Sequence, residues 1–189
     1  MRRLLLIALA VLLSGCGGSK KSGESSIPPL DESKSYSLVM RTNLGSFTVA
    51  LDQKLAPHTC ASLVSLARKG FFDGTIFHRI VPGFVIQGGD PTGKGSGGPG
   101  YTTVDPPPAN VRYTRGVVAM AKTQEEPPGT AGSQFFVVTG IDVGLPPEYA
   151  VAGRVVNGLG VVLRIGRLGN ASEQPTRRVE IERVRVLVS

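Results

Sequence analysis

The chain has 189 residues, enough for one domain of ordinary size and a shorter terminal segment. Hydrophobic residues make up 41% and charged residues 19%, so a packed core is possible, and 25 glycines with 14 prolines indicate the many turns of an all-β fold. The formal net charge is +7, but lysines and arginines are scattered, so we expect a solvated basic surface and no nucleic-acid partner.

Residues 1–15 have the pattern of a secretory signal peptide. Two arginines precede an apolar run over residues 4–13, which is too short to span a membrane. Residues 13–16, Leu-Ser-Gly-Cys, resemble a bacterial lipobox, in which Cys16 is acylated and becomes the new N-terminus. An ordinary cleaved signal with an incidental cysteine is the alternative.

Residues 16–35 are predicted to be the lipidated cysteine and a disordered tether. They are rich in Gly, Ser and Lys, a composition that does not build a core. The tether would hold a folded domain, residues 36–189, away from the membrane. We therefore expect an extracytoplasmic protein, lipid-anchored through Cys16 to the bacterial cell membrane or outer membrane.

The folded domain begins with a predicted β-hairpin and a helix. Residues 36–42 and 45–51 alternate apolar and polar side chains around a short connection. Pro57 can open a helix, and Gly70 can end it. The apolar stripe of this helix consists of Cys60, Leu63, Val64 and Ala67.

The rest of the chain is predicted to be short strands, one short helix and two long loops. The predicted strands are residues 116–121, 134–139, 150–155 and 179–188. The predicted helix is residues 159–165, and the loops are residues 90–108 and 124–132. In the last strand the alternation slips at Glu182-Arg183, which indicates a β-bulge. This pattern predicts a mainly β sandwich or barrel.

Residues 76–90 are the most informative stretch. They are apolar and β-branched, and Pro82-Gly83 predicts two short strands joined by a turn. Arg79 and Gln87 interrupt these strands, and polar groups in a core-like strand need a partner or a use. Taken alone, Arg79 would be a structural, salt-bridged arginine and Gln87 a satisfied buried amide.

This stretch closely resembles the signature of the cyclophilins, the peptidyl-prolyl cis/trans isomerases. Residues 132–138, Gly-Ser-Gln-Phe-Phe-Val-Val, resemble the second signature of that family, and residues 116–121 lie between the two in the same order. The resemblance runs from about Tyr36 to Ser189. It implies a closed eight-stranded antiparallel β-barrel capped by two α-helices, and an isomerase that needs neither a cofactor nor a metal.

The resemblance also implies roles for individual residues. Arg79 corresponds to the catalytic arginine, and Gln87 to the glutamine that contacts the substrate backbone and helps hold the arginine. The implied proline pocket consists of Phe84, Val85 and Phe136, which would otherwise be core residues. The implied groove and far wall consist of Ala121, Lys122, Gln134, Leu145 and Tyr149.

Four positions depart from the common pattern of the family. Val85 replaces a methionine, Lys122 an asparagine and Tyr149 a histidine. Gly144 lies where many eukaryotic members have a tryptophan, and the chain contains no Trp. The departures imply a working isomerase that binds cyclosporin-like inhibitors weakly.

Rotation about an X-Pro bond needs no nucleophile, because it only has to overcome amide resonance, a barrier of about 18–20 kcal/mol. An arginine aimed at the prolyl nitrogen would stabilise the twisted state more than either planar state. We therefore expect Arg79 to catalyse isomerisation of X-Pro bonds in secreted or envelope proteins. The substrates would be proline-containing polypeptides that are unfolded or flexible. The alternative is a module that binds proline-containing segments, or a holdase chaperone, with little turnover. A monomer is expected in either case.

Other chemistries are not supported by the pattern. His78 is next to Arg79, but strand alternation places it on the opposite face, and rotation moves no proton. Residues 93–98 match GxGxxG, but prolines follow where a nucleotide site needs a helix. With Cys16 lipidated, Cys60 has no disulfide partner, and it is predicted to be buried and inert.

Overall fold

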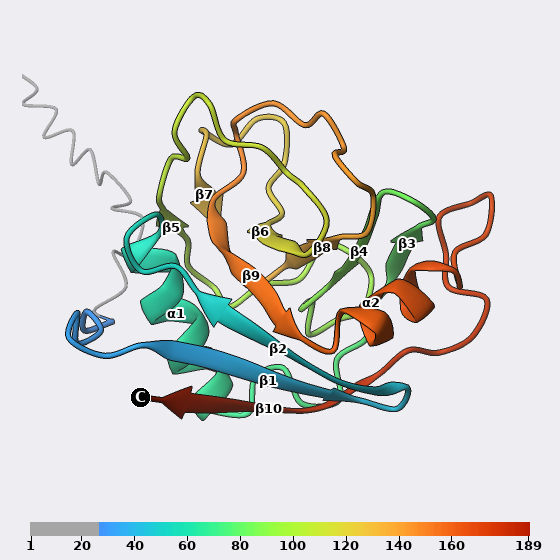
Figure 1. Cartoon of the computed structure of the whole chain (residues 1–189), viewed down its shortest axis with the longest axis horizontal. Coiled ribbons are helices and arrows are strands. Elements are labelled where there is room, and N and C mark those ends of the chain that lie inside the picture. The colour runs from blue at the N-terminus through green and yellow to red at the C-terminus, as the bar shows by residue number, and fades with distance from the viewer. Residues whose placement is uncertain (1–26) are drawn as a thin grey trace, which may run out of the picture.

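The computed structural model describes residues 27–189, which form a curled antiparallel β-sheet with two helices packed against it (Figure 1). The predicted signal peptide, Cys16 and the first part of the tether lie outside the described residues. The main sheet has eight strands in the order β10-β1-β2-β9-β6-β8-β4-β3, and β5 pairs separately with β7. The strands are β1 (Tyr36–Thr42), β2 (Gly45–Leu51), β3 (Arg79–Val81), β4 (Val85–Gly88), β5 (Thr103–Val104), β6 (Val117–Met120), β7 (Thr130–Ala131), β8 (Phe135–Val138), β9 (Val151–Asn157) and β10 (Ile181–Val188).

The sheet curls but does not close. Within the described residues no β-ladder joins its edge strands, β10 and β3. Only isolated β-bridges of the described residues lie between these edges, and in them Ile76 pairs with Glu180 and with Asp90. β3 begins only at Arg79, and the segment before it contains a turn at residues 71–74 and the single bridge residue Ile76. The mainly β fold with two helices is confirmed, and the prediction of a closed barrel is wrong.

The two helices form where the local sequence favours them. α1 (Pro57–Arg68) has a proline in its first turn, where the backbone N–H groups have no acceptor within the helix, so the N–H that proline lacks is not needed. The predicted apolar stripe of α1 is buried. α2 (Leu159–Gly166) follows Gly158, whose φ of 76° is in the left-handed region that favours glycine. α1 packs against β10 and β5, and α2 against β2, β3 and β4 (Figure 1). None of the helices within residues 27–189 has the length and apolar character to cross a bilayer.

Strands β6 and β8 are buried on both faces, which is why their sequences are apolar without alternation. One face packs into the main core, where the rings of Phe72 and Phe77 each meet Phe135 edge to face, with centroids 6.1 and 6.0 Å apart. The other face supports a second apolar cluster that includes Tyr113 and Phe136. The candidate site lies on this second face.

The predicted hairpin and both predicted helices are confirmed, and so is the bulge in the last strand. Arg41 pairs with Arg183 and Thr42 with Ile181, so Glu182 has no partner in β1. The two segments predicted as loops are not entirely irregular, since they contain β5 and β7, which pair with each other. Strands of two residues are too short to leave a periodic pattern in the sequence.

Residues 27–35, the last part of the predicted tether, lie against the domain. Ser35 and Ser189 exchange two backbone hydrogen bonds, of 2.8 and 3.0 Å, and Gln53 donates to the Lys34 carbonyl oxygen at 2.8 Å. The segment before β1 is therefore joined to the end of β10.

Cys60 is buried in α1, as predicted, and its thiol donates to the carbonyl oxygen of Ala152 at 3.5 Å. Burial raises the pKa of this thiol to about 12, and the nearby Asp105 and Asp52 carboxylates act in the same direction. The thiol is therefore protonated at neutral pH and shielded from reagents.

Candidate active site

Arg79 and Gln87 face each other across the hairpin formed by β3 and β4. Pro82-Gly83 makes the turn, and Gly83 has a φ of 72°, which favours glycine. The register pairs Arg79 directly with Gln87, and Arg79 Nη1 donates to Gln87 Oε1 at 3.3 Å. The spacing of these two residues in the sequence is therefore that of a cross-strand pair.

A row of cross-strand pairs continues from Gln87 into the apolar face. Gln87 opposes Phe136 on β8, and Phe136 opposes Ala119 on β6. Directly opposed residues project from the same face of a sheet, so Arg79, Gln87 and Phe136 lie on one face in that order. A guanidinium and an aromatic ring thus share one surface, with an amide between them.

The predicted proline pocket and far wall belong to one apolar cluster on this face. Val85 and Phe136 are buried in it, and the half-buried members that pack against them include Phe84, Ala121, Leu145 and Tyr149. The rings of Phe136 and Tyr149 meet edge to face with centroids 5.5 Å apart. The structure therefore brings residues that are up to 65 positions apart together in one apolar cluster.

Tyr113, which the sequence did not single out, fixes the position of Tyr149. Its hydroxyl donates to the Tyr149 carbonyl oxygen at 2.8 Å and accepts from the Tyr149 N–H at 3.0 Å. Burial raises the pKa of Tyr113 to about 12, so the hydroxyl keeps the proton that it donates.

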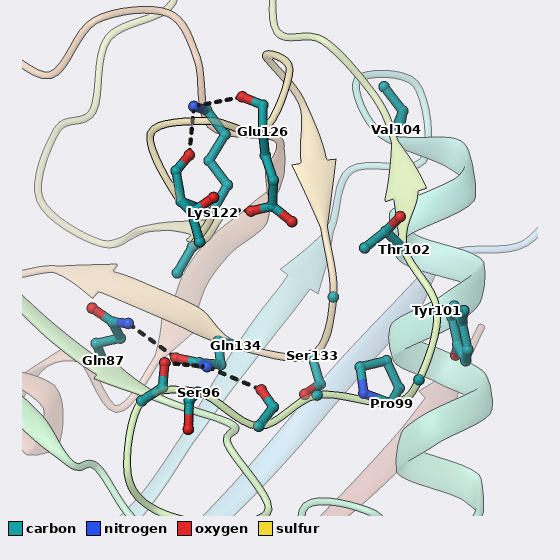
Figure 2. A pocket seen from close by; sticks show the side chains of 17 residues that line it. Gln87, Ser96, Pro99, Tyr101, Thr102, Val104, Lys122, Glu126, Ser133 and Gln134 are labelled. Carbon is teal, nitrogen blue, oxygen red and sulfur yellow. Dashed lines mark hydrogen bonds between the residues drawn. The ribbon is translucent and has the colours of Figure 1, made fainter. Parts of the chain in front are cut away.

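A groove of about 810 Å³ opens beside Gln87 (Figure 2). Gln87 Nε2 donates to Gln134 Oε1 at 3.2 Å, and Gln134 Nε2 donates to the carbonyl oxygens of Gly95 and Gly97 at 2.9 and 3.0 Å. Figure 2 shows Gln87 and Gln134 together on one side of the groove and Lys122 on another. The polar row and the groove are thus one connected surface.

A sequence model of the family described as cyclophilin type peptidyl-prolyl cis-trans isomerase/CLD matches residues 37–186. The chain belongs to the cyclophilin family. Peptidyl-prolyl cis-trans isomerase-like 1 of Homo sapiens is 38% identical over 162 residues, which cover 83% of this chain and 95% of the human protein. The protein of the same name from Gibberella zeae is 39% identical over 155 residues, 79% of this chain and 94% of the fungal one.

Solved structures agree with this membership. The crystal structure of a Cryptosporidium parvum cyclophilin type peptidyl-prolyl cis-trans isomerase has a TM-score of 0.74 and 30% identity to this cyclophilin, covering 81% of this chain and 98% of that one. The same protein crystallised in the presence of the dipeptide Ala-Pro matches with a TM-score of 0.73. This cyclophilin is therefore a peptidyl-prolyl cis-trans isomerase. The family model matches residues of the folded domain and none of residues 1–36.

A carboxylate that the sequence did not reveal lies against Arg79 of this cyclophilin. Arg79 Nε donates to Glu173 Oε2 at 2.6 Å. Glu173 follows Arg79 by 94 residues and lies in the loop between α2 and β10, where no local pattern marks it.

Asp90, also missed as a functional residue, holds the glycine-rich loop that forms part of the groove. Its buried carboxylate accepts from the N–H groups of Thr92 at 2.7 Å and Gly95 at 2.5 Å. Burial raises the pKa of Asp90, but hydrogen bonds from the Thr92, Gly97 and Gly95 backbone outweigh it and lower the pKa to about 2. Residues 95–101 line the groove as a result of this anchoring.

Lys122 uses its side chain inside the cyclophilin domain. The side chain is only 2% exposed, and Nζ lies 3.0 Å from Glu148 Oε2. It also donates to the carbonyl oxygens of Thr123 and Glu126, both at 3.1 Å, and lies 5.7 Å from the centroid of the Tyr149 ring. The lysine thus connects the loop after β6 to the far wall of the site.

His78 is shielded although it is next to Arg79. Both of its ring nitrogens are buried, and neither has a hydrogen-bond partner among the described residues. Burial lowers its pKa and outweighs the Asp90 carboxylate, which raises it, and the charge of Arg79 acts in the same direction as burial. Within residues 27–189 no group of three or more His, Cys, Asp or Glu side chains is arranged to hold a metal ion.

Proposed function

We propose that Arg79 of this isomerase donates a hydrogen bond to the prolyl nitrogen as the X-Pro bond rotates, and that the clients are proline-containing, unfolded or flexible proteins of the cell envelope or secreted proteins. The observation that supports the mechanism is the cross-strand row of Arg79, Gln87 and Phe136. It sets a positively charged donor beside an apolar surface that fits a proline ring.

The amide nitrogen of an X-Pro bond gains a localised lone pair only when the bond twists out of resonance. A donor next to that nitrogen therefore binds the twisted state more tightly than either planar state, which is the condition for catalysis. Arg79 Nε and Nη1 are engaged with Glu173 and Gln87, and within residues 27–189 Nη2 has no protein acceptor. Lowering the barrier by about 7 kcal/mol would give an acceleration of about 10⁵-fold.

Gln87 supports the arginine from the neighbouring strand. Its Oε1 accepts from Arg79, and its Nε2 is held by Gln134, so the amide cannot turn without breaking a bond. The apolar cluster around Phe136 would hold the proline ring and keep water from the bond. No step transfers a proton or forms a covalent intermediate, so neither His78 nor Cys60 has a role.

Anchoring at a membrane through a lipid on Cys16 belongs to the same proposal. It is supported by the apolar run and the Leu-Ser-Gly-Cys sequence at residues 13–16. An enzyme held in this way would meet chains that are still unfolded after crossing the membrane, when X-Pro bonds are heterogeneous.

The experiment uses residues 27–189, since solved relatives that consist almost entirely of this domain fold without a leader. Isomerisation of a short X-Pro peptide is compared between the wild type, Arg79→Ala and Arg41→Ala. Arg41 is the control because it forms a comparable surface ion pair, with Glu182 at 2.9 Å, on β1.

We expect Arg79→Ala to lower kcat/KM by about 10²–10³-fold, the usual effect of removing a donor that acts in the transition state. Arg41→Ala should leave the rate unchanged. A rate in Arg79→Ala equal to that of the wild type would contradict the mechanism. A folded wild type that binds the peptide without accelerating its isomerisation would instead favour the holdase alternative.

A further inference from the structure

The catalytic candidate Arg79 is held from two directions. Its Nε donates to Glu173 Oε2 at 2.6 Å, and its Nη1 donates to Gln87 Oε1 at 3.3 Å. The shorter contact is with the carboxylate, which comes from a loop distant in sequence. The side chains of Arg79 and Glu173 are 36% and 48% exposed, so this ion pair lies at the solvent edge of the site.

The loop that carries Glu173 is fixed by its own hydrogen bonds. Asn170 Oδ1 accepts from the N–H groups of Ser172 and Gln174, at 2.9 and 3.0 Å. The carbonyl oxygen of Glu173 accepts from the N–H of Ile80, the residue after Arg79, at 2.8 Å. Backbone and side chain of Glu173 therefore both contact β3 beside the arginine.

Glu173 also has an unusual backbone conformation. Its φ is 61°, and among residues 27–189 it is the one residue other than glycine with a positive φ. Residues with a Cβ are strained in this region, and glycine is not. The position thus carries a carboxylate where the backbone alone would favour glycine, which indicates a role for the side chain.

We propose that Glu173 is a positioning residue for the isomerase reaction: it holds Arg79 Nε so that the rest of the guanidinium stays directed over the substrate surface next to Gln87. This role rests on the proposed function of Arg79. An arginine side chain has large rotamer freedom, and the substrate would otherwise have to restrict it during each turnover. The carboxylate removes that freedom before the substrate binds.

The negative charge of Glu173 has a second, smaller effect on the reaction, which opposes the benefit of holding the arginine in place. A carboxylate beside the guanidinium reduces its positive potential and so weakens its donation to the prolyl nitrogen. Both groups are exposed enough for water to screen the pair, and such surface pairs interact weakly. Orientation of the arginine therefore outweighs the loss of potential, and removing the carboxylate slows the reaction.

Glu173→Gly gives a sharp test, because it removes the carboxylate and also relieves the backbone strain. We expect kcat to fall about five- to tenfold, because the arginine side chain regains rotamer freedom that must be lost again in each turnover. KM should change less than about twofold. Tm should stay the same or rise, since glycine adopts this φ freely. Glu173→Gln keeps the length and one acceptor oxygen, so it should recover part of the lost kcat.

Glu182→Ala is the matched control, because Glu182 forms a similar exposed ion pair with Arg41, between β10 and β1. Its kcat should equal that of the wild type. A merely structural role for Glu173 would instead lower Tm and kcat together. A kcat of Glu173→Gly equal to that of the wild type would overturn the proposal.

Two further measurements separate this proposal from the proposed function. In an Arg79→Ala background, Glu173→Gly should cause no additional loss of kcat, because the carboxylate acts only through the arginine. The Nε–H resonance of Arg79 should be sharp and slowly exchanging in the wild type and broadened in Glu173→Gly. If Arg79→Ala itself keeps full activity, the mechanism fails; if it is inactive and Glu173→Gly is fully active, only the role of Glu173 fails.

Discussion

Lys122 is a cation with its side chain almost completely buried, and its contacts join two parts of the site. Replacing it by alanine would leave the carbonyl oxygens of Thr123 and Glu126 without their donor and Glu148 without its partner. We expect Lys122→Ala to lower the free energy of unfolding by about 1–3 kcal/mol. KM for an X-Pro peptide should rise several-fold, because the loop after β6 and Tyr149 both lose an anchor.

Urea unfolding and initial rates measure these two effects. Lys54→Ala is the control, since Lys54 is exposed and its side chain forms no ion pair among the described residues. Equal stability of Lys122→Ala and Lys54→Ala would show that the buried contacts of Lys122 contribute nothing.

The sequence predicted those residues of the candidate site that stand out from their neighbours. Arg79 and Gln87 were recognisable because they interrupt apolar strands, and their role could be inferred because two motifs occur in register. Glu173 and Tyr113 were not recognisable, since each acts through a contact with a residue far along the chain. Such contacts depend on the fold and leave no pattern of spacing around either residue.

Asp90 controls the order of a whole element, the glycine-rich loop along the groove. Its pKa is lowered from 3.8 to about 2 in the folded protein, so the folded state favours the ionised form. The stability this adds is fully present above a pH of about 4 and is lost as the pH falls toward 2, and we expect it to be about 2 kcal/mol. Below that range Thr92 and Gly95 lose a charged acceptor.

The free energy of unfolding of the wild type and Asp90→Asn, measured between pH 6 and pH 2, tests this directly. The difference between them should shrink as the pH falls through this window, because only the wild type has the carboxylate to protonate. Glu32→Gln, which changes an exposed carboxylate, should show the same pH profile as the wild type. A constant difference between wild type and Asp90→Asn at every pH would exclude Asp90 as the source.

At the scale of elements, the sequence predicts what is amphipathic or bounded by strong turn residues. The first hairpin alternates, α1 has a helical stripe between Pro57 and Gly70, and the bulge at Glu182 interrupts an otherwise regular strand. β5 and β7 could not be predicted, because two-residue strands are defined by their pairing and not by their side chains. The failure of the sheet to close likewise depends on pairing, because the segment before β3 forms only isolated bridges, at Ile76.

At the scale of the whole molecule, the ends of the folded domain lie together. Ser35 and Ser189 are hydrogen-bonded to each other, and β1 and β10 pair along their full length from that point. The chain therefore enters the domain beside the end of β10, which is one edge strand of the sheet (Figure 1). Arg79 lies on β3, the other edge strand in the sheet order.

The proposed anchor leads to the last prediction. If Cys16 is acylated, the protein expressed in a bacterial host should incorporate labelled palmitate and sediment with the membranes, because several acyl chains on one residue hold a protein there stably. Cys16→Ser should lose the label and leave the membrane fraction. Cys60→Ser is the matched control: it removes the other cysteine of the chain, which is buried, and it should keep both the label and the membrane association. An unlabelled, soluble wild type would mean that residues 1–15 act as an ordinary cleaved signal and that the isomerase works free of any lipid, with its activity on X-Pro peptides unchanged.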